Sequence, residues 1–228
     1  MTDCPPAAPA FCFRSTGGSV NAVAAPLELR LSGQTAEGLA VLVPLLGCGE
    51  EAAASAFDGM AAAPPLAHAA LATIAAEERV HDVLLKQVAA SLPSIDRTSA
   101  ALHASKRFHI SLGRGGAGLH LGRIAAIDAA LCLVIARLIR PGTPIAAERQ
   151  LHRIFARIHR DEARHVRVSR TLAIAGLPVA RLRNVGAAAR EAMADIIALA
   201  GESFDALSVD PDAVRRDVAR LLDGLFTA

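Results

Sequence analysis

Two copies of one short pattern in the sequence could place a carboxylate and an imidazole side by side. In each copy an acid is followed by a glutamate, two further residues and a histidine: Glu77-Glu78-Arg79-Val80-His81 and Asp161-Glu162-Ala163-Arg164-His165. Residues three apart lie on one face of a helix, so the glutamate and the histidine of each copy point to the same side. Two Glu-x-x-His pairs arise by chance in roughly one sequence in twenty, and the preceding acids make coincidence rarer still.

The helix face that would carry each pair is otherwise apolar. Glu78 shares its face with Leu71, Ile74 and Leu85, and Glu162 shares its face with Leu151, Phe155 and Ile158. An ionised carboxylate buried without a partner is strongly unfavourable. Surface pairs that only support a helix are the alternative reading. The apolar faces favour a metal site enclosed between helices.

Two further helices are expected to complete this site. The first carries the neighbouring acids Glu50 and Glu51, and both could be ligands. Glu50 is preferred because it lies on the apolar stripe with Leu46 and Phe57. The third helix carries one acid, Asp128, on a stripe of apolar residues, where a lone carboxylate is uncommon unless it is paired or bound to metal.

These elements predict an all-α protein. The predicted helices lie at residues 34 or 44 to 63, 66–91, 119–140, 145–175, 187–207 and 211–225. Residues 1–33 are expected to form an extension, and the polar stretch 94–118, with a short helix, is expected to cross the bundle. The helical domain would then span 34–228, with the metal-binding bundle at 44–175 and accessory helices at 187–226 that cover it or form a homodimer contact.

The motifs resemble those of a known superfamily. Asp161 to His165 is a close match to the last ligand helix of the ferritin-like diiron-carboxylate superfamily, and Gly49-Glu50 followed by Phe57 is similar to its first. The resemblance covers about residues 40–175 and implies a ferritin-like four-helix bundle with additional C-terminal helices. The ligands that it implies are Glu50, Glu78, His81, Asp128, Glu162 and His165. Asp128 departs from the pattern, because the family more often has Glu there.

The resemblance also implies a set of residues around the ligands. The acid before each bridging glutamate orients the histidine of the other motif, so Glu77 would support His165 and Asp161 would support His81. His159 lies one turn before Glu162 and is either a further ligand, as in some N-oxygenating relatives, or an outer residue that supports the site.

The ligand set suits two iron ions, with manganese as the alternative. We expect dioxygen to be used to oxidise or hydroxylate a small or carrier-bound organic substrate. A ferroxidase or iron-handling role is the main rival, followed by a metal-binding bundle without turnover. The chain has no Tyr and no Trp, which excludes a radical-storing subunit like the ribonucleotide reductase small chain. It also lacks Cys-x-x-Cys, which argues against a rubrerythrin.

Composition sets the remaining expectations. With 228 residues, 53% of them hydrophobic, the chain can build one core. The net charge of +2 singles out no partner, and nucleic acid is not expected. Charged residues interrupt the longest apolar helix, so no membrane span is expected. The four cysteines form no recognisable framework and are interpreted as reduced thiols. No signal peptide is evident, so the expected location is the cytoplasm.

One face of the fourth predicted helix is rich in arginine. The stripe consists of Arg149, Arg153, Arg157, Arg160, Arg164 and Arg167. It is centred on the side of the helix opposite Glu162. It is expected either to pair with acids of the C-terminal helices, such as Glu191, Asp195 or Glu202, or to dock an acidic electron-donor or carrier protein.

Overall fold

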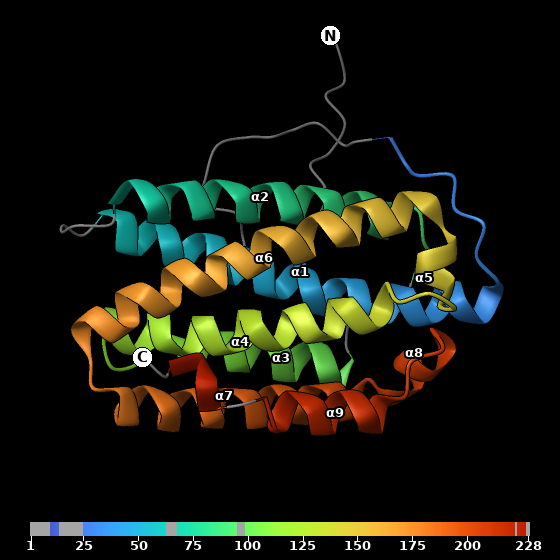
Figure 1. Ribbon diagram of the computed structural model, residues 1–228. Helices are drawn as coiled ribbons and strands as arrows, with labels where there is room; N and C mark the ends of the chain where they lie inside the picture. Colours follow the sequence, from blue (N-terminus) through green and yellow to red (C-terminus); the bar gives the residue numbers. More distant parts are fainter. Residues whose placement is uncertain (1–9, 14–24, 63–67, 95–98, 222, 227–228) are drawn as a thin grey trace, which may run out of the picture.

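The computed structural model describes residues 10–13, 25–62, 68–94, 99–221 and 223–226. Every regular element in these ranges is helical (Figure 1), as the all-α prediction requires. The elements are α1 (Gly33–Ala62), α2 (His68–Ala90), α3 (Ala100–Leu112), α4 (Ala117–Leu138), α5 (Pro144–Ala147), α6 (Arg149–Gly176), α7 (Val179–Leu199), α8 (Gly201–Ala206), α9 (Pro211–Ala219) and the 3-10 turn η1 (Asp223–Phe226).

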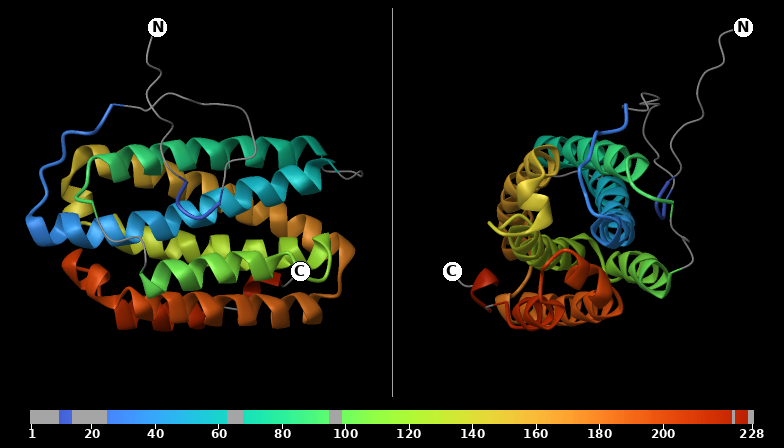
Figure 2. Two further views of the ribbon diagram at one scale, coloured as in Figure 1. Left: turned by 180° about the vertical axis from the view of Figure 1, so that it is seen from behind. Right: turned by 90° about the vertical axis from the view of Figure 1, so that its right-hand side faces the viewer.

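The four long helices α1, α2, α4 and α6 form two antiparallel hairpins that face each other. α1 packs along α2, and α4 packs along α6. The end-on view shows the two hairpins side by side (Figure 2, right). α3 runs back along the outside of the bundle between the end of α2 and the start of α4 (Figure 1). As a result α4 runs in the same direction as α2, and all four helices contribute to one interior.

The apolar core is divided into two parts along the bundle. One part includes Leu39, Leu85, Ile135, Leu151 and Phe155. The other includes Phe57, Ile74, Ile124, Ala173 and Leu182. On each of the four long helices, the predicted ligands lie at sequence positions between these two parts. The apolar side chains therefore fix the helices on both sides of the ligand level and keep water away from it.

Three predicted helices differ from the structure in their boundaries. The helix expected at 187–207 begins at Val179 and is divided into α7 and α8, and the helix expected at 211–225 ends at Ala219. The single helix expected at 145–175 is divided into α5 and α6, because Glu148 is extended with φ −87° and ψ 104°. The Glu148 carboxylate accepts the Gln150 N–H at 3.4 Å and caps α6. At the C-terminal side, Asp210 accepts the Ala213 N–H at 3.0 Å and starts α9, as the Asp-Pro pair predicts.

The C-terminal helices form a layer on one side of the bundle. α7 packs against α4 and α3, and α9 packs against α7. In Figures 1 and 2 this layer lies below the α3–α4 side, away from the outer face of α6. The expected oligomer contact is not tested by a single chain.

The arginine stripe of α6 is consequently not covered by this layer. Five of its six members, Arg149, Arg153, Arg157, Arg160 and Arg167, are exposed. Arg164 is half-buried and pairs with Glu77, at 2.7 Å. The expected pairing with Glu191, Asp195 or Glu202 is wrong for the described part of the chain, because no ion pair there joins these acids to the stripe. The reason is that α7 packs on α4 instead of α6.

Two pieces of the N-terminal extension lie against the bundle. Residues 25–32 follow its surface, where the Leu27 N–H donates to Ser91 Oγ at 2.6 Å and the Arg30 N–H donates to Glu148 Oε2 at 3.1 Å. Residues 10–13, here called the strap, lie on α1. The Phe11 ring of the strap occupies the space beside Gly47, where a Cβ would come within 2.0 Å of the ring.

The strap corrects the expectation that the cysteines are reduced. Cys12 of the strap forms a disulfide with Cys48 of α1, 36 residues along the chain. The sequence gives no sign of this bond, because docking of the strap brings the two cysteines together and no spacing pattern does. Cys132 is a free thiol, and Cys4 lies outside the described residues.

Two helices, α1 and α4, are long and apolar enough to cross a membrane by composition alone. Within the fold, 56% of the apolar window of α1 and 61% of that of α4 are buried. Core helices of a bundle have the same composition. The two helices also carry the buried acids Glu50 and Asp128, so their apolar character is that of a core surrounding a polar site.

Candidate metal centre

Buried acids and histidines from α1, α2 and α6 meet in the middle of the bundle. Glu50, Glu78, His81, Glu162 and His165 are each at most 3% exposed. One potential ligand atom from each of Glu50, Glu78, His81 and Glu162 lies within 4.8 Å of the others. This group, together with His165, is called the cluster below. Its composition and burial show that it could hold a metal ion.

The two histidines face the same carboxylates through the same ring atom. His81 Nδ1 lies 3.2 Å from Glu50 Oε2, 3.5 Å from Glu78 Oε2 and 3.3 Å from Glu162 Oε1. His165 Nδ1 lies 3.1 Å from Glu78 Oε1 and 3.5 Å from Glu162 Oε2. Glu78 and Glu162 each lie between both imidazoles.

The other ring nitrogen of each histidine faces a carboxylate on the opposite hairpin. His165 Nε2 lies 2.9 Å from Glu77 Oε2, and His81 Nε2 lies 3.3 Å from Asp161 Oδ2. These are the two cross-helix pairs that the resemblance implied. When Nε2–H donates to a carboxylate, the ring is held in the tautomer whose Nδ1 lone pair points into the cluster.

Arginines of α6 hold these outer carboxylates in turn. Arg164 pairs with Glu77 and lies 3.7 Å from Asp161, which also lies 3.7 Å from Arg157. Partial burial raises the pKa of Glu77, but hydrogen bonds from Arg164 and His165 outweigh this effect and lower it. The carboxylate is therefore ionised and well suited to accept the imidazole N–H.

The electrostatics of the cluster call for positive charge at its centre. Burial and the neighbouring Glu78 raise the pKa of Glu50 to about 8, against a smaller lowering by His81. Burial alone would lower the pKa of His165, yet Glu162 and Glu78 raise it to about 11. Burial would also lower the pKa of His81, but its neighbours Glu162, Glu50 and Glu78 raise that pKa above its usual value. Protons supply this charge in the metal-free protein, and cations can replace them.

Several buried cluster atoms have no hydrogen-bond partner. They are Glu78 Oε2, Glu162 Oε1 and His165 Nδ1. His165 Nδ1 lies 3.1 Å from Glu78 Oε1 but makes no hydrogen bond. Buried polar atoms are normally paired, so unpaired atoms converging on one point fit ligands of a shared cation.

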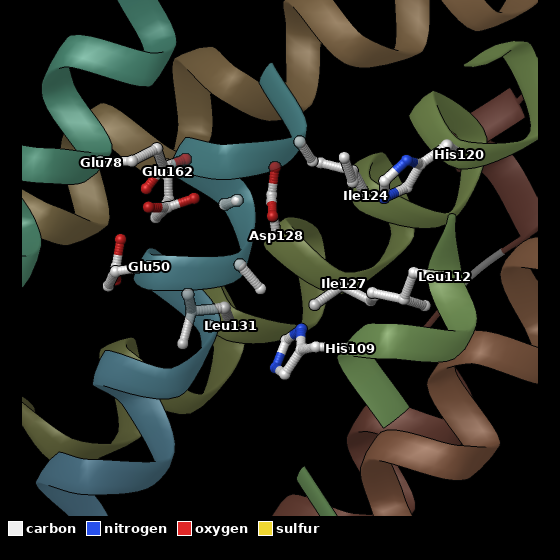
Figure 3. Close-up of a pocket in the computed structure, with 14 residues that line it drawn as sticks. Glu50, Glu78, His109, Leu112, His120, Ile124, Ile127, Asp128, Leu131 and Glu162 are labelled. Atoms are coloured by element: carbon white, nitrogen blue, oxygen red, sulfur yellow. The ribbon is translucent and has the colours of Figure 1, made fainter. Parts of the chain in front are cut away.

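Asp128 lies beside the cluster on its α4 side. Figure 3 shows its carboxylate between the cluster glutamates and the imidazole of His120. The side chain is buried and Oδ2 has no partner. Burial, and then the negative charges of Glu162 and Glu78, raise the pKa of Asp128 well above its usual value. Asp128 is outside the group of four whose ligand atoms converge, so its role as a ligand stays a prediction.

Glu51 has a different task from Glu50. Its carboxylate accepts the backbone N–H groups of Phe11, Cys12 and Phe13 at 2.7, 2.8 and 2.7 Å. Lys86 Nζ lies 3.2 Å from Glu51 Oε1. Glu51 therefore holds the strap, and Glu50 is the acid of α1 that faces the cluster.

His159 does not join the cluster in this structure. It is half-buried, and within the described residues its side chain makes no hydrogen bond or ion pair. Only its backbone carbonyl has a contact, with Cys132 Sγ at 3.8 Å. Its proposed role as a further ligand or a supporting residue stays a prediction without a contact to support it.

An apolar cavity of about 80 Å³, here called the cluster cavity, opens beside the cluster (Figure 3). Glu50, Glu78, Asp128 and Glu162 form its polar end, and His109 and His120 lie on its other walls. The motif search missed His109 because it lies in the polar stretch between the hairpins. The signal that could have found it is the spacing of the buried residues of α3, since His109 follows buried Ser105 by four.

Comparisons of this chain with protein-family models, with curated proteins and with solved structures find no match. The candidate centre therefore rests on the residues and their geometry.

Proposed function

We propose that the chain is a dimetal oxidoreductase of the ferritin-like diiron-carboxylate type. It would use dioxygen to oxidise or hydroxylate a small organic molecule. The observation that carries the proposal is the matched orientation of His81 and His165. Each turns Nδ1 to the shared glutamates and Nε2 to an outer carboxylate. Two equivalent imidazoles on either side of two shared carboxylates provide one site for each of two ions.

The charges of the surrounding acids support a centre with two metal ions. Glu50, Glu78, Asp128 and Glu162 would carry four negative charges when all are ionised, and two neutral imidazoles add none. Two divalent cations balance this charge. With a single divalent cation, two of these acids would have to keep a proton for the dry interior to stay neutral, and those two could not serve as ionised ligands.

Iron is the ion that this donor set and the proposed chemistry favour, and manganese is the alternative. Ferrous ions held here would supply electrons for the reduction of dioxygen. The protein residues supply the rest. The outer carboxylates Glu77 and Asp161 fix the imidazole rings, and the two parts of the apolar core exclude water from the ligand level.

The cluster cavity favours an organic substrate over iron handling. Apart from the acids of the cluster end and the two histidines, its walls are alkyl side chains such as Leu112, Ile124, Ile127 and Leu131. An entry path for hydrated iron needs polar groups along its length, whereas an organic molecule binds to apolar walls.

The exposed arginine stripe supports an acidic electron-donor protein as the partner. Arg164 belongs to the stripe and contacts Glu77, which contacts His165, so the stripe is joined to the cluster by short polar contacts. Electrostatic attraction between exposed charges is screened beyond about 8 Å at physiological ionic strength. Donor-dependent reduction should therefore slow as salt is raised, and a rate independent of salt would contradict docking at this surface.

Metal counting with a matched pair of variants tests the proposal. Protein loaded with ferrous iron without oxygen, then freed of unbound metal, should contain about two ions per chain. Glu50→Gln should reduce this content, whereas Glu51→Gln, which changes the adjacent buried acid, should not. Helicity measured by circular dichroism shows that both variants are folded. Iron content that is negligible in the unaltered protein, or equally reduced in both variants, would contradict the proposal.

Oxygen uptake distinguishes the oxidoreductase from its rival. With two iron ions bound and no reductant or substrate, uptake should stop after the bound iron is oxidised. Uptake that continues in proportion to added ferrous iron would show an iron-oxidising protein.

A further inference from the structure

A second apolar cavity adjoins the cluster cavity. It has a volume of about 90 Å³ and is enclosed by α1, α3, α4, α7 and α8. We call it the adjoining cavity. Gly49, His109, Ile127 and Leu131 line both cavities. The two spaces are therefore neighbours that share a wall, and only the cluster cavity contacts the cluster.

The lining of the adjoining cavity excludes charged molecules. Apart from Ser105, His109 and Gly49, its lining residues are all hydrophobic, including Met193, Ile196 and Ile197 of α7. Transfer of a charged group into such a space without a partner is strongly unfavourable. An alkyl chain has no hydrogen bonds to lose there, and its transfer out of water is favourable.

His109 provides a hydrogen-bonding group at the shared wall. Burial, and then the neighbouring His120, lower the pKa of His109 to about 4, so the ring is neutral near pH 7. A neutral imidazole offers one donor and one acceptor. Within the described residues its ring nitrogens have no hydrogen-bond partner, and its ring packs edge-on against the Phe108 ring, with 5.1 Å between the centroids. Gly49 leaves room beside the ring, since a Cβ there would lie 3.6 Å from Cε1.

The size of the two cavities limits the shape of a ligand. Each is about half of the ~150 Å³ that holds one benzene ring in an engineered apolar cavity. Neither space alone holds a ring, and a ligand that occupied both would have to be a slim chain passing between the residues that line both. Asp128, with its unpaired Oδ2, lines the cluster cavity but not the adjoining cavity.

We propose that the two cavities form the binding site for a neutral, unbranched aliphatic molecule with one hydroxyl or carbonyl head. The tail occupies the adjoining cavity, and the head lies in the cluster cavity, where His109 binds it. The head and the carbon atom that carries it then lie nearest to the cluster. This molecule would be the substrate of the proposed oxidoreductase. Its oxidation rests on the proposed function, whereas its binding rests on the two cavities alone.

Titration with 1-alkanols of increasing length tests the site directly. Calorimetry on iron-loaded protein without oxygen should show affinity rising about fourfold for each added methylene group. The rise should stop once both cavities are filled. Affinity that is independent of chain length would overturn the inference.

Two variants locate the site. Ile197→Phe places extra volume in the adjoining cavity and should weaken the longest well-bound alkanol at least tenfold, without affecting the shortest. Leu199→Phe is the matched control, because Leu199 lies on the same helix but is 56% exposed and lines neither cavity. Equal effects of the two substitutions, or no effect of Ile197→Phe, would show that the tail does not lie in the adjoining cavity.

His109→Leu tests the head. It should weaken alkanols about tenfold, the size expected for one lost hydrogen bond, while 1-chloroalkanes of the same length bind as before. Equal losses for both series would assign His109 a packing role alone and overturn its role in binding the head.

The two proposals fail in different ways. Normal alkanol binding without oxygen uptake would contradict the proposed function only. Two bound irons and oxygen uptake without alkanol binding would contradict the substrate class only.

Discussion

The two helix hairpins bring the same kinds of groups to the cluster but use one of them differently. The α1–α2 hairpin supplies Glu50 with Glu78 and His81, and the α4–α6 hairpin supplies Asp128 with Glu162 and His165. The Glu50 carboxylate extends into the cluster and makes a hydrogen bond with His81, with 3.2 Å between Oε2 and Nδ1. Asp128 occupies the matching place on α4 but its Oδ2 has no partner.

The cluster cavity lies beside this pair of acids, between the two hairpins. Gly49, Ala53 and Ala56 of α1 line it together with Asp128 and Leu131 of α4. On the α1 side, the neighbouring acid Glu51 holds the strap, and Phe11 fills the space beside Gly47. The strap thus covers one side of α1, while both hairpins face the space where a substrate would bind.

Removing a shared glutamate should have the largest effect, and the same effect in either hairpin. Glu78 and Glu162 both lie between the two imidazoles, so Glu78→Ala or Glu162→Ala would remove a ligand from both ions of the proposed centre. Metal affinity, measured by competition with a chelator, should fall more than the hundredfold typical of outer residues. A large loss from only one of the two substitutions would contradict their equivalence.

Removal of the strap disulfide affects the first hairpin alone. The bond between Cys12 and Cys48 joins residues 36 apart, a separation for which cross-links contribute about 2–4 kcal/mol to the free energy of unfolding. Cys48→Ser should lower stability by that amount in denaturant titrations, and reductant should have the same effect on the unaltered protein. Cys132→Ser should leave the sensitivity to reductant unchanged. Equal stability with and without reductant would contradict a stabilising disulfide.

The outer carboxylates come next in size. Asp161→Asn and Glu77→Gln should each weaken metal binding by roughly ten- to a hundredfold, equivalent to about 1.4–2.7 kcal/mol. Glu77→Gln should have the larger effect, since its contact with His165 is 2.9 Å, against 3.3 Å between Asp161 and His81. Chelator competition measures both. Unchanged affinity in both variants would mean that the imidazoles are oriented by packing alone.

The sequence could predict which residues face the centre because helical periodicity relates each of them to its neighbours. The spacing of Glu78 and His81, and the apolar stripe around Glu50, are local properties that survive in the fold. Which carboxylate meets which imidazole across the hairpins is not local. That pairing was available only through the resemblance of the motifs, and residues 77 and 161 occupy the implied places.

Other features depend on contacts that no local pattern encodes. The strap has no periodicity, and its docking is decided by three N–H groups that reach Glu51 over about forty residues. The position of α7 on α4, which leaves the arginine stripe exposed, depends on how two amphipathic faces match. His109 belongs to a short helix in a polar stretch, where a weak pattern says little about burial.

The smallest effect is expected from making the second hairpin resemble the first. Asp128→Glu adds one methylene group and keeps the charge, so the protein should still bind about two ions, with affinity changed less than tenfold. Alkanol binding should weaken, because the longer side chain makes the cluster cavity smaller.

The matched variant Asp128→Asn tests the unpaired carboxyl group in the metal-free protein. Burial raises the pKa of Asp128 in the native state, so the native protein retains a proton that the unfolded chain loses above about pH 4, and this group lowers stability progressively as the pH rises. Denaturant titrations of the metal-free proteins at pH 5 and pH 8 should therefore show a larger loss with pH for the unaltered protein than for Asp128→Asn. The same dependence on pH in both would mean that Asp128 is paired in solution, and the asymmetry between the hairpins would not hold.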